Sequence, residues 1–389
     1  MHKFYIFTKI NKETLKFILS ILFAFSLTTG IFCQGKKNLP KNDGKIAFEA
    51  NLSSGRILRH NEKFLPSVTQ QSYGFEVNAS YKTFGDKNWQ RALNYPEIGI
   101  GYIQTHFGDK EIFGSAYGLL PFVKFNIVRS KPVDFYAKLG AGVSYISKSY
   151  HPVSNPLNNV IGSKINSIIQ FRMGLDFALY PEVDLVLAGT LTHYSNSSTQ
   201  APNLGINLPT VNIGVVYKPK EFTKEYNTEK NLDEFRRKNE YTLRLSLGIK
   251  DKVARGAKYP VYSGAIQYAR YFGYANKLIA GVSFSFDQYE YDFIKIQEIG
   301  EEDELIADAS DFSVYAGYEM MVGKVGINFL VGTYLYGKVK NDTPLWAKPG
   351  ITYYFTEFGK HKHKPFVGIN IKTHYFVAQY AEMHFGIAF

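Results

Sequence analysis

Cysteine is almost absent from this chain, which has one, Cys33, in 389 residues. Disulfide bonds within the chain are therefore excluded, and so is a zinc site built on several thiolates. Long apolar runs are also missing, because no run after residue 33 approaches the roughly 20 residues of a membrane-spanning helix. The sequence has no glycine-rich phosphate loop and no recognisable nucleic-acid module, so nucleotide-dependent chemistry and nucleic-acid binding are not expected.

The N-terminus has the pattern of a secretory signal. Four lysines between residues 3 and 16 precede an apolar run from 17 to 27, and small and polar residues follow. We predict that residues 1–33 are a signal peptide that takes no part in the fold. Their removal takes away four lysines and one glutamate, so the formal net charge falls from +11 to +8. The remaining basic residues are scattered, which suits the anionic phosphates of a bacterial outer leaflet.

From residue 45 onward the chain consists of segments with strict alternation. The segment FSVYAGYE, residues 312–319, places Phe, Val, Ala and Tyr at one parity and Ser, Tyr, Gly and Glu at the other. Successive side chains of a strand point to opposite faces, so each segment has an apolar aromatic face and a small or polar face. A soluble β-sandwich also alternates, but it rarely has so many aromatic residues at strand ends. We predict an all-β fold, a transmembrane antiparallel β-barrel.

The last segment supports a bacterial outer-membrane barrel. Met383, Phe385, Ile387 and Phe389 share one face, and the chain ends on that aromatic residue. This ending resembles the assembly signal of outer-membrane proteins. We therefore expect the outer membrane of a Gram-negative bacterium as the location, and the barrel-assembly machinery as a partner during biogenesis.

About sixteen strand segments are present, an even number as in bacterial barrels of this kind. Eight precede and eight follow a densely charged stretch at 219–239. We predict a first half at 34–218, a linker at 219–239 and a second half at 240–389 that is a degenerate duplicate of the first. The sequence leaves open two tandem eight-stranded barrels or one large sixteen-stranded barrel. The predicted segments are 45–55, 71–82, 96–107, 112–128, 132–146, 163–179, 182–195, 208–218, 240–251, 259–272, 277–290, 311–321, 324–337, 347–357, 364–375 and 379–389.

The segment 182–195 places two reactive side chains on an apolar face. His193 and Ser195 have the same parity as Leu191 and Leu187. If the strands start at the periplasm, this segment ends at the outer surface. A hydroxyl and an imidazole at the end of a lipid-facing stripe indicate ester chemistry on a membrane lipid.

The residues around this pair resemble a known family. The sequence HYSNSSTQAPNLGINLPTVNIGVVY, residues 193–217, has His-x-Ser-Asn, then Pro-Asn-x-Gly-Ile, then a closing aromatic strand. This is similar to the C-terminal hairpin of the PagL-type lipid A 3-O-deacylases, which are eight-stranded outer-membrane barrels. The first half has the length of a complete family member.

The resemblance implies a role for each matched residue. It implies that Ser195 is the nucleophile and His193 the base that takes its proton. It also implies that Asn196, Asn203 and Gly205 surround the oxyanion. Asn207 stands where the family has a glutamate, so the third member of the triad is neutral here. An amide oxygen can orient the imidazole, but it brings no charge to stabilise the imidazolium.

We predict an outer-membrane esterase that hydrolyses an ester-linked 3-hydroxyacyl chain of lipid A, with its active site facing the outer leaflet. The substrate partner is then lipid A or lipopolysaccharide, and no cofactor or metal is needed. The alternative is a non-catalytic barrel that acts as a pore, a binding protein or a structural protein. The oligomeric state stays open. Two segments, 298–304 and 360–364, are rich in acidic residues or histidine, but their spacing is typical of solvated loops and not of metal sites.

Overall fold

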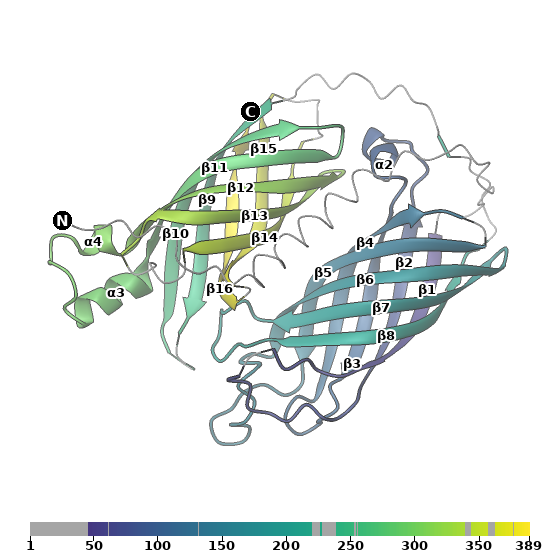
Figure 1. Ribbon diagram of the computed structural model, residues 1–389, viewed down its shortest axis with the longest axis horizontal. Helices are drawn as coiled ribbons and strands as arrows, with labels where there is room; N and C mark the ends of the chain where they lie inside the picture. The colour runs from purple at the N-terminus through teal and green to yellow at the C-terminus, as the bar shows by residue number, and fades with distance from the viewer. Residues whose placement is uncertain are drawn as a thin grey trace.

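The structure is a computed structural model that describes residues 46–60, 62–130, 132–219, 226–227, 239–252, 254, 256–338, 344–356, 362–375 and 377–389. The predicted signal peptide and most of the charged linker lie outside these residues. Figure 1 shows two barrels side by side, the first in purple and teal and the second in green and yellow.

Eight strands close into the first barrel, with each strand hydrogen-bonded to the next and β1 to β8. The short helix α2 (Asn88–Ala92) lies in the connection between β2 and β3. The strands are β1 (Ile46–Gly55), β2 (Ser72–Lys82), β3 (Glu97–His106), β4 (Ser115–Val128), β5 (Val133–Ile146), β6 (Ile165–Tyr180), β7 (Val183–Ser195) and β8 (Ile206–Tyr217).

The second barrel also has eight strands, and β9 closes it by pairing with both β10 and β16. Helices α3 (Gln288–Ile296) and α4 (Leu305–Asp308) lie in the connection between β11 and β12. The strands are β9 (Asn239–Asp251), β10 (Lys258–Tyr271), β11 (Asn276–Asp287), β12 (Ser310–Val322), β13 (Val325–Tyr336), β14 (Leu345–Tyr354), β15 (Lys364–His374) and β16 (Val377–Ala388).

The closures decide between the two arrangements that the sequence left open. Phe48–Gly55 of β1 pairs with Thr210–Tyr217 of β8, so the first sheet has no edge left to pair with the second half. The predicted antiparallel barrel fold is confirmed, in the form of two tandem eight-stranded barrels.

One predicted strand is shorter than the sequence pattern indicated. The segment expected at 277–290 ends at Asp287, where helix α3 begins. The Asp287 carboxylate accepts hydrogen bonds from the backbone N–H groups of Tyr289 and Glu290. This side-chain cap satisfies amides at the helix start, and it ends the strand although the alternating pattern continues.

Ion pairs fill the interior of the first barrel. Arg172, which is fully buried, bonds Glu49 and Glu76 at 2.9 and 2.6 Å, and Lys138 bonds Glu76 at 2.5 Å. An eight-stranded barrel is just wide enough for side chains to fill. These strands therefore enclose a packed polar core, and their apolar side chains face outward.

The second barrel is filled in the same way. Lys277 bonds Glu240 at 2.9 Å and Glu319 at 2.7 Å, and all three side chains are at most 2% exposed. Elsewhere in this barrel Lys348 bonds Glu382 at 2.9 Å. Among the described residues, no helix is both long and apolar enough to cross a membrane.

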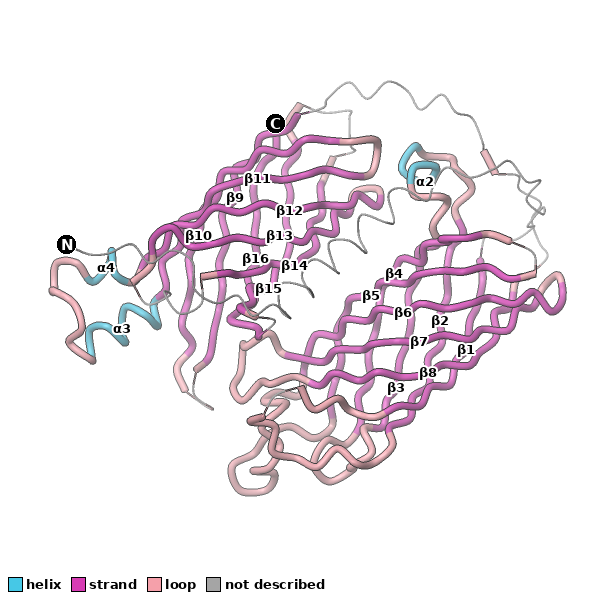
Figure 2. The backbone as a smooth tube through the Cα atoms, viewed as in Figure 1, coloured by secondary structure: helices cyan, strands magenta, loops and turns pink. Residues whose placement is uncertain are grey.

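The two ends of the first barrel differ in their loops and in their contacts with the second barrel. Figure 2 shows the long loops of the first barrel gathered at one end, where β7 finishes and β8 begins. At the other end, Leu93 beside α2 and Phe125 of β4 form an apolar cluster with Ala275 and Val322 of the second barrel. The two barrels thus touch at the short-turn end, and a polar contact between them lies at the long-loop end.

Candidate active site

The hairpin of β7 and β8 places His193 directly opposite Asn207 in the antiparallel register. The ring Nδ1 lies 2.6 Å from the Asn207 side-chain oxygen Oδ1. Because an amide oxygen only accepts hydrogen bonds, Nδ1 carries the proton and the lone pair of the neutral ring is on Nε2. Within the described part of the chain, Nε2 makes no hydrogen bond and no carboxylate contacts the ring. The neutral Asn207 side chain therefore orients the imidazole so that Nε2 can accept a proton.

His193 lies on the outer wall of the barrel. Its strand neighbour on the other side is Ile169, which is exposed, and Leu191 pairs with the exposed Pro209 one step further along. Residues directly opposite each other in a sheet share a face. The imidazole therefore belongs to the same apolar outer stripe as these side chains.

Ser195 is the last residue of β7, and its hydroxyl is held by the following loop. The side chain of Asn203 both donates to Ser195 Oγ, at 3.0 Å, and accepts from it, at 3.3 Å. The backbone N–H of Ser197 also donates to Ser195 Oγ, at 3.0 Å. Ser195 is 4% exposed, and it makes no hydrogen bond to His193. Catalytic hydrogen bonds are often long or poorly aligned before substrate binds.

The other residues that the resemblance assigned to the oxyanion pocket make different contacts. The Asn196 backbone N–H donates to Asn203 Oδ1 at 3.1 Å, while the Asn196 side-chain amide donates within the loop to the Gln200 carbonyl at 2.7 Å. The Gly205 N–H donates to the carbonyl of Val160. Asn203 and the Ser197 amide are thus the donors that point at Ser195 Oγ.

Gly205 shapes the space beside the imidazole. It has a φ of +77°, and a Cβ added there would lie 2.8 Å from His193 Cε1. Glycine adopts a positive φ without steric cost. A larger residue at this position would displace the ring, so Gly205 lets the backbone approach the edge of His193.

Other candidate sites do not gather reactive groups. His374 lies on the inner face of β15, as its parity predicts, and its Nε2 is 2.8 Å from the Tyr334 hydroxyl. No cluster of three or more His, Cys, Asp or Glu side chains suited to a metal occurs among the residues described. His361 of the histidine-rich turn lies outside them.

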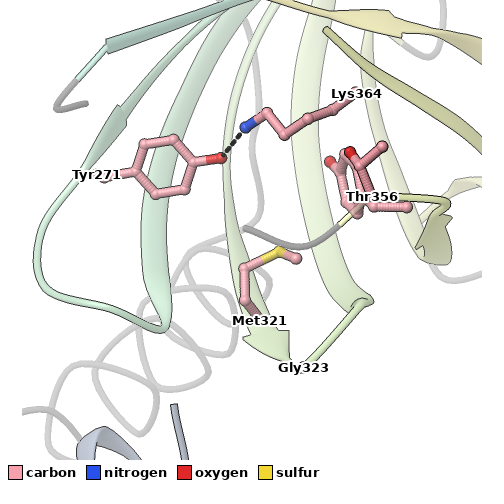
Figure 3. A pocket seen from close by; sticks show the side chains of 6 residues that line it. Tyr271, Met321, Gly323, Thr356 and Lys364 are labelled. Carbon is pink, nitrogen blue, oxygen red and sulfur yellow. Dashed lines mark hydrogen bonds between the residues drawn. The ribbon is translucent and has the colours of Figure 1, made fainter. Parts of the chain in front are cut away.

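The second barrel has a small cleft at its short-turn end. Figure 3 shows its lining, with the Lys364 ammonium donating to the Tyr271 hydroxyl at 3.1 Å. Met321, Gly323, Tyr354 and Thr356 complete the wall. Lys364 also pairs with Glu240, so this cationic group belongs to the packed interior.

The sequence did not indicate two residues near the site, Asp251 and Lys258 of the second barrel. Lys258 Nζ donates to the carbonyl of Thr199 in the loop after Ser195, at 2.6 Å. These residues are 56 and 63 positions from Ser195 and belong to another sheet. No local pattern could have connected them with the site.

Two family models match the chain. Residues 73–216 match the model for lipid A 3-O-deacylase (PagL), and residues 239–389 match the model for the C-terminal domain of acyloxyacyl hydrolase. The match of the first barrel to lipid A 3-O-deacylase confirms the resemblance that residues 193–217 indicated. Comparison with curated proteins gave no match.

Among the solved structures that match, three cover less than half of this chain. Neisserial surface protein A is 13% identical, with a TM-score of 0.32, and the match covers 46% of this chain and 100% of that protein. The outer membrane enzyme PagL is 16% identical, with a TM-score of 0.31 and coverages of 43% and 97%. Ail of Yersinia pestis is 16% identical, with a TM-score of 0.28 and coverages of 45% and 98%.

Proposed function

We propose that this chain is an outer-membrane esterase that removes an ester-linked 3-hydroxyacyl chain from lipid A. The main support is the bond between His193 Nδ1 and Asn207 Oδ1, which leaves Nε2 free on the outer wall, two residues from Ser195. The match of residues 73–216 to the lipid A 3-O-deacylase model supports the substrate class. Residues 1–33 are proposed as the signal peptide that directs the chain to the envelope.

In the proposed reaction, Ser195 Oγ attacks the ester carbonyl carbon and its proton passes to His193 Nε2. The Asn203 amide and the Ser197 N–H, which now donate to Oγ, are placed to stabilise the oxyanion. The ester C–O bond breaks, and the sugar hydroxyl leaves with the proton from His193. Water, deprotonated by the same nitrogen, then releases the 3-hydroxy fatty acid and restores Ser195. The reaction needs no cofactor.

The substrate is proposed to stay in the outer leaflet during the reaction. Its acyl chains would lie along the exposed stripe of Leu191, Leu187 and Val211, which are 46%, 41% and 75% exposed. The site would then lie at the outer rim, with the sugar and phosphates among the long loops. A lipid could be cut there without leaving the membrane.

The alternative is a barrel that keeps the deacylase scaffold without the activity. Its support is specific, because Asn207 is neutral and Ser195 Oγ is bonded to Asn203 instead of to His193. Such a protein would bind lipid or stabilise the envelope without changing lipid A.

Mass spectrometry of lipid A from a Gram-negative host that expresses the chain distinguishes the two. We expect the intact protein to shift lipid A by the mass of one 3-hydroxyacyl chain. Ser195→Ala should abolish the shift, because loss of a catalytic serine costs roughly 10⁶-fold. The control is Ser130→Ala, at an exposed position in the β4–β5 turn at the opposite end of the barrel, which should keep full activity. Deacylation that survives Ser195→Ala would exclude Ser195 as the nucleophile.

A further inference from the structure

The loop after Ser195 has a backbone that must be held in place. Ser197 and Ser198 have φ values of 55° and 63°. Non-glycine residues rarely adopt this left-handed region, and two in succession persist only where the surroundings enforce them. Because the Ser197 N–H donates to Ser195 Oγ, the conformation of this loop sets the surroundings of the hydroxyl.

Two hydrogen bonds to the second barrel help to hold this backbone. The N–H of Asp251, at the end of β9, donates to the Ser198 carbonyl at 2.9 Å. The Ser198 hydroxyl donates to the carbonyl of Ala378, near the start of β16, at 2.6 Å. Ser198 is thus hydrogen-bonded to the second barrel through both its carbonyl and its side chain.

An ion pair between the buried Asp251 and the half-exposed Lys258 completes the contact. The Asp251 side chain is fully buried, and its Oδ2 accepts from Lys258 Nζ at 2.6 Å and from the Ala201 N–H at 3.3 Å. Lys258 donates in turn to the Thr199 carbonyl. A buried carboxylate needs such partners, so the pair and the loop stabilise one another.

The barrels are also joined at their other end, which limits how far this contact can move. Trp89, Leu93 and Phe125 of the first barrel pack with Ala275 and Val322 of the second. With apolar packing at one end and polar bonds at the other, the second barrel presents Asp251 and Lys258 at a fixed place beside the loop.

We infer that the second barrel positions the active-site loop, and that Asp251 and Lys258 are positioning residues for the reaction proposed above, on which this inference rests. They hold Ser198–Ala201 so that the Ser197 N–H and, through Asn196, the Asn203 side chain stay directed at Ser195 Oγ. The second half of the chain is then part of the enzyme, and more than a degenerate copy of the first.

The test uses the full chain with Asp251→Ala and Lys258→Ala. A small displacement of catalytic groups can cost about 10²-fold, so we expect kcat to fall by about ten- to a hundredfold while KM changes less than about threefold. Lys258→Arg keeps a donor and should restore most of kcat. The matched control is Lys338→Ala, which breaks another Lys–Asp pair of the second barrel, Lys338 with Asp308 at 2.5 Å, with similar exposure. It should leave kcat unchanged.

A second readout does not depend on lipid A. The rate at which a fluorophosphonate probe labels Ser195 should fall in Asp251→Ala and Lys258→Ala but not in Lys338→Ala. If both variants keep the wild-type labelling rate or the wild-type kcat, the inference is wrong, although the proposed function stands. If the intact protein labels Ser195 without deacylating lipid A, the substrate is wrong and the labelling rates alone decide the inference. If it does neither, both proposals fail.

The contact itself can be tested separately. Ser198→Cys with Ala378→Cys should form a disulfide on mild oxidation of the full chain, because the Ser198 hydroxyl lies 2.6 Å from the Ala378 carbonyl oxygen. Cys33 is the only other cysteine that could compete. Failure to form it would overturn the inference whatever the activity. Heat-modifiable mobility on gels confirms that each variant is folded.

Discussion

At the scale of single residues, Asn207 is the position at which the site departs from the deacylase motif that it resembles. Its oxygen takes the place of a carboxylate beside His193 Nδ1, at 2.6 Å. The orientation of the imidazole is kept, while the charge that stabilises an imidazolium is lost. The family motif was enough to place these two side chains together. The bond from Ser195 to Asn203 was not predictable, because strand parity ends with β7.

A carboxylate at position 207 should therefore raise activity. Asn207→Asp keeps the side-chain shape and makes the bond to His193 charge-assisted, which is worth roughly 1 kcal/mol more than a neutral bond. If this extra stabilisation of about 1 kcal/mol applies to the imidazolium in the transition state, kcat rises about fivefold. Kinetics of the purified protein on lipid A in detergent micelles measure it. A fall in kcat would show that the amide N–H₂ group of Asn207 is needed.

At the scale of the element, β7 shows how one strand serves two environments. Val186, Ala188 and Thr190 are buried in the lumen, while Leu187 and Leu191 are exposed on the outer wall. The alternation in the sequence predicted these faces, because the pleat of a strand has a period of two. The helix α3 was not predicted. Its start depends on the Asp287 side chain capping two amides, which overrides an alternating pattern.

If the outer wall of β7 faces lipid, a charge at its middle should be costly. Leu187→Arg should lower the free energy of unfolding by about 2–4 kcal/mol, and Val183→Arg at the end of the strand by about 0–1 kcal/mol. Urea unfolding in lipid vesicles gives both values. Equal effects at the two positions would mean that this face does not lie in the hydrocarbon.

At the scale of the whole molecule, the chain forms two small barrels instead of one wide barrel. Each interior is filled by buried ion pairs, such as Arg172 with Glu76 and Lys277 with Glu319. Removing one partner of such a pair is costly because a buried charge is left unpaired. The described interiors therefore act as rigid cores that support the outer wall and the loops.

We expect no ion conductance from either barrel. In planar bilayers the intact protein should give no discrete current steps under conditions in which a sixteen-stranded porin does, because the lumen of an eight-stranded barrel is occupied by side chains. Stable, voltage-independent steps would contradict the packing of the interior. They would also favour the pore over the esterase.

The sequence by itself determined the strands and their two faces, because alternation is a property of short stretches of chain. The family motif, also a short stretch, pointed to Ser195, His193 and Asn207. Only the tertiary structure decided that there are two closed barrels and that Asp251 and Lys258 hold the loop after Ser195. Those features depend on pairing between residues far apart in the chain, which leaves no local pattern in the sequence.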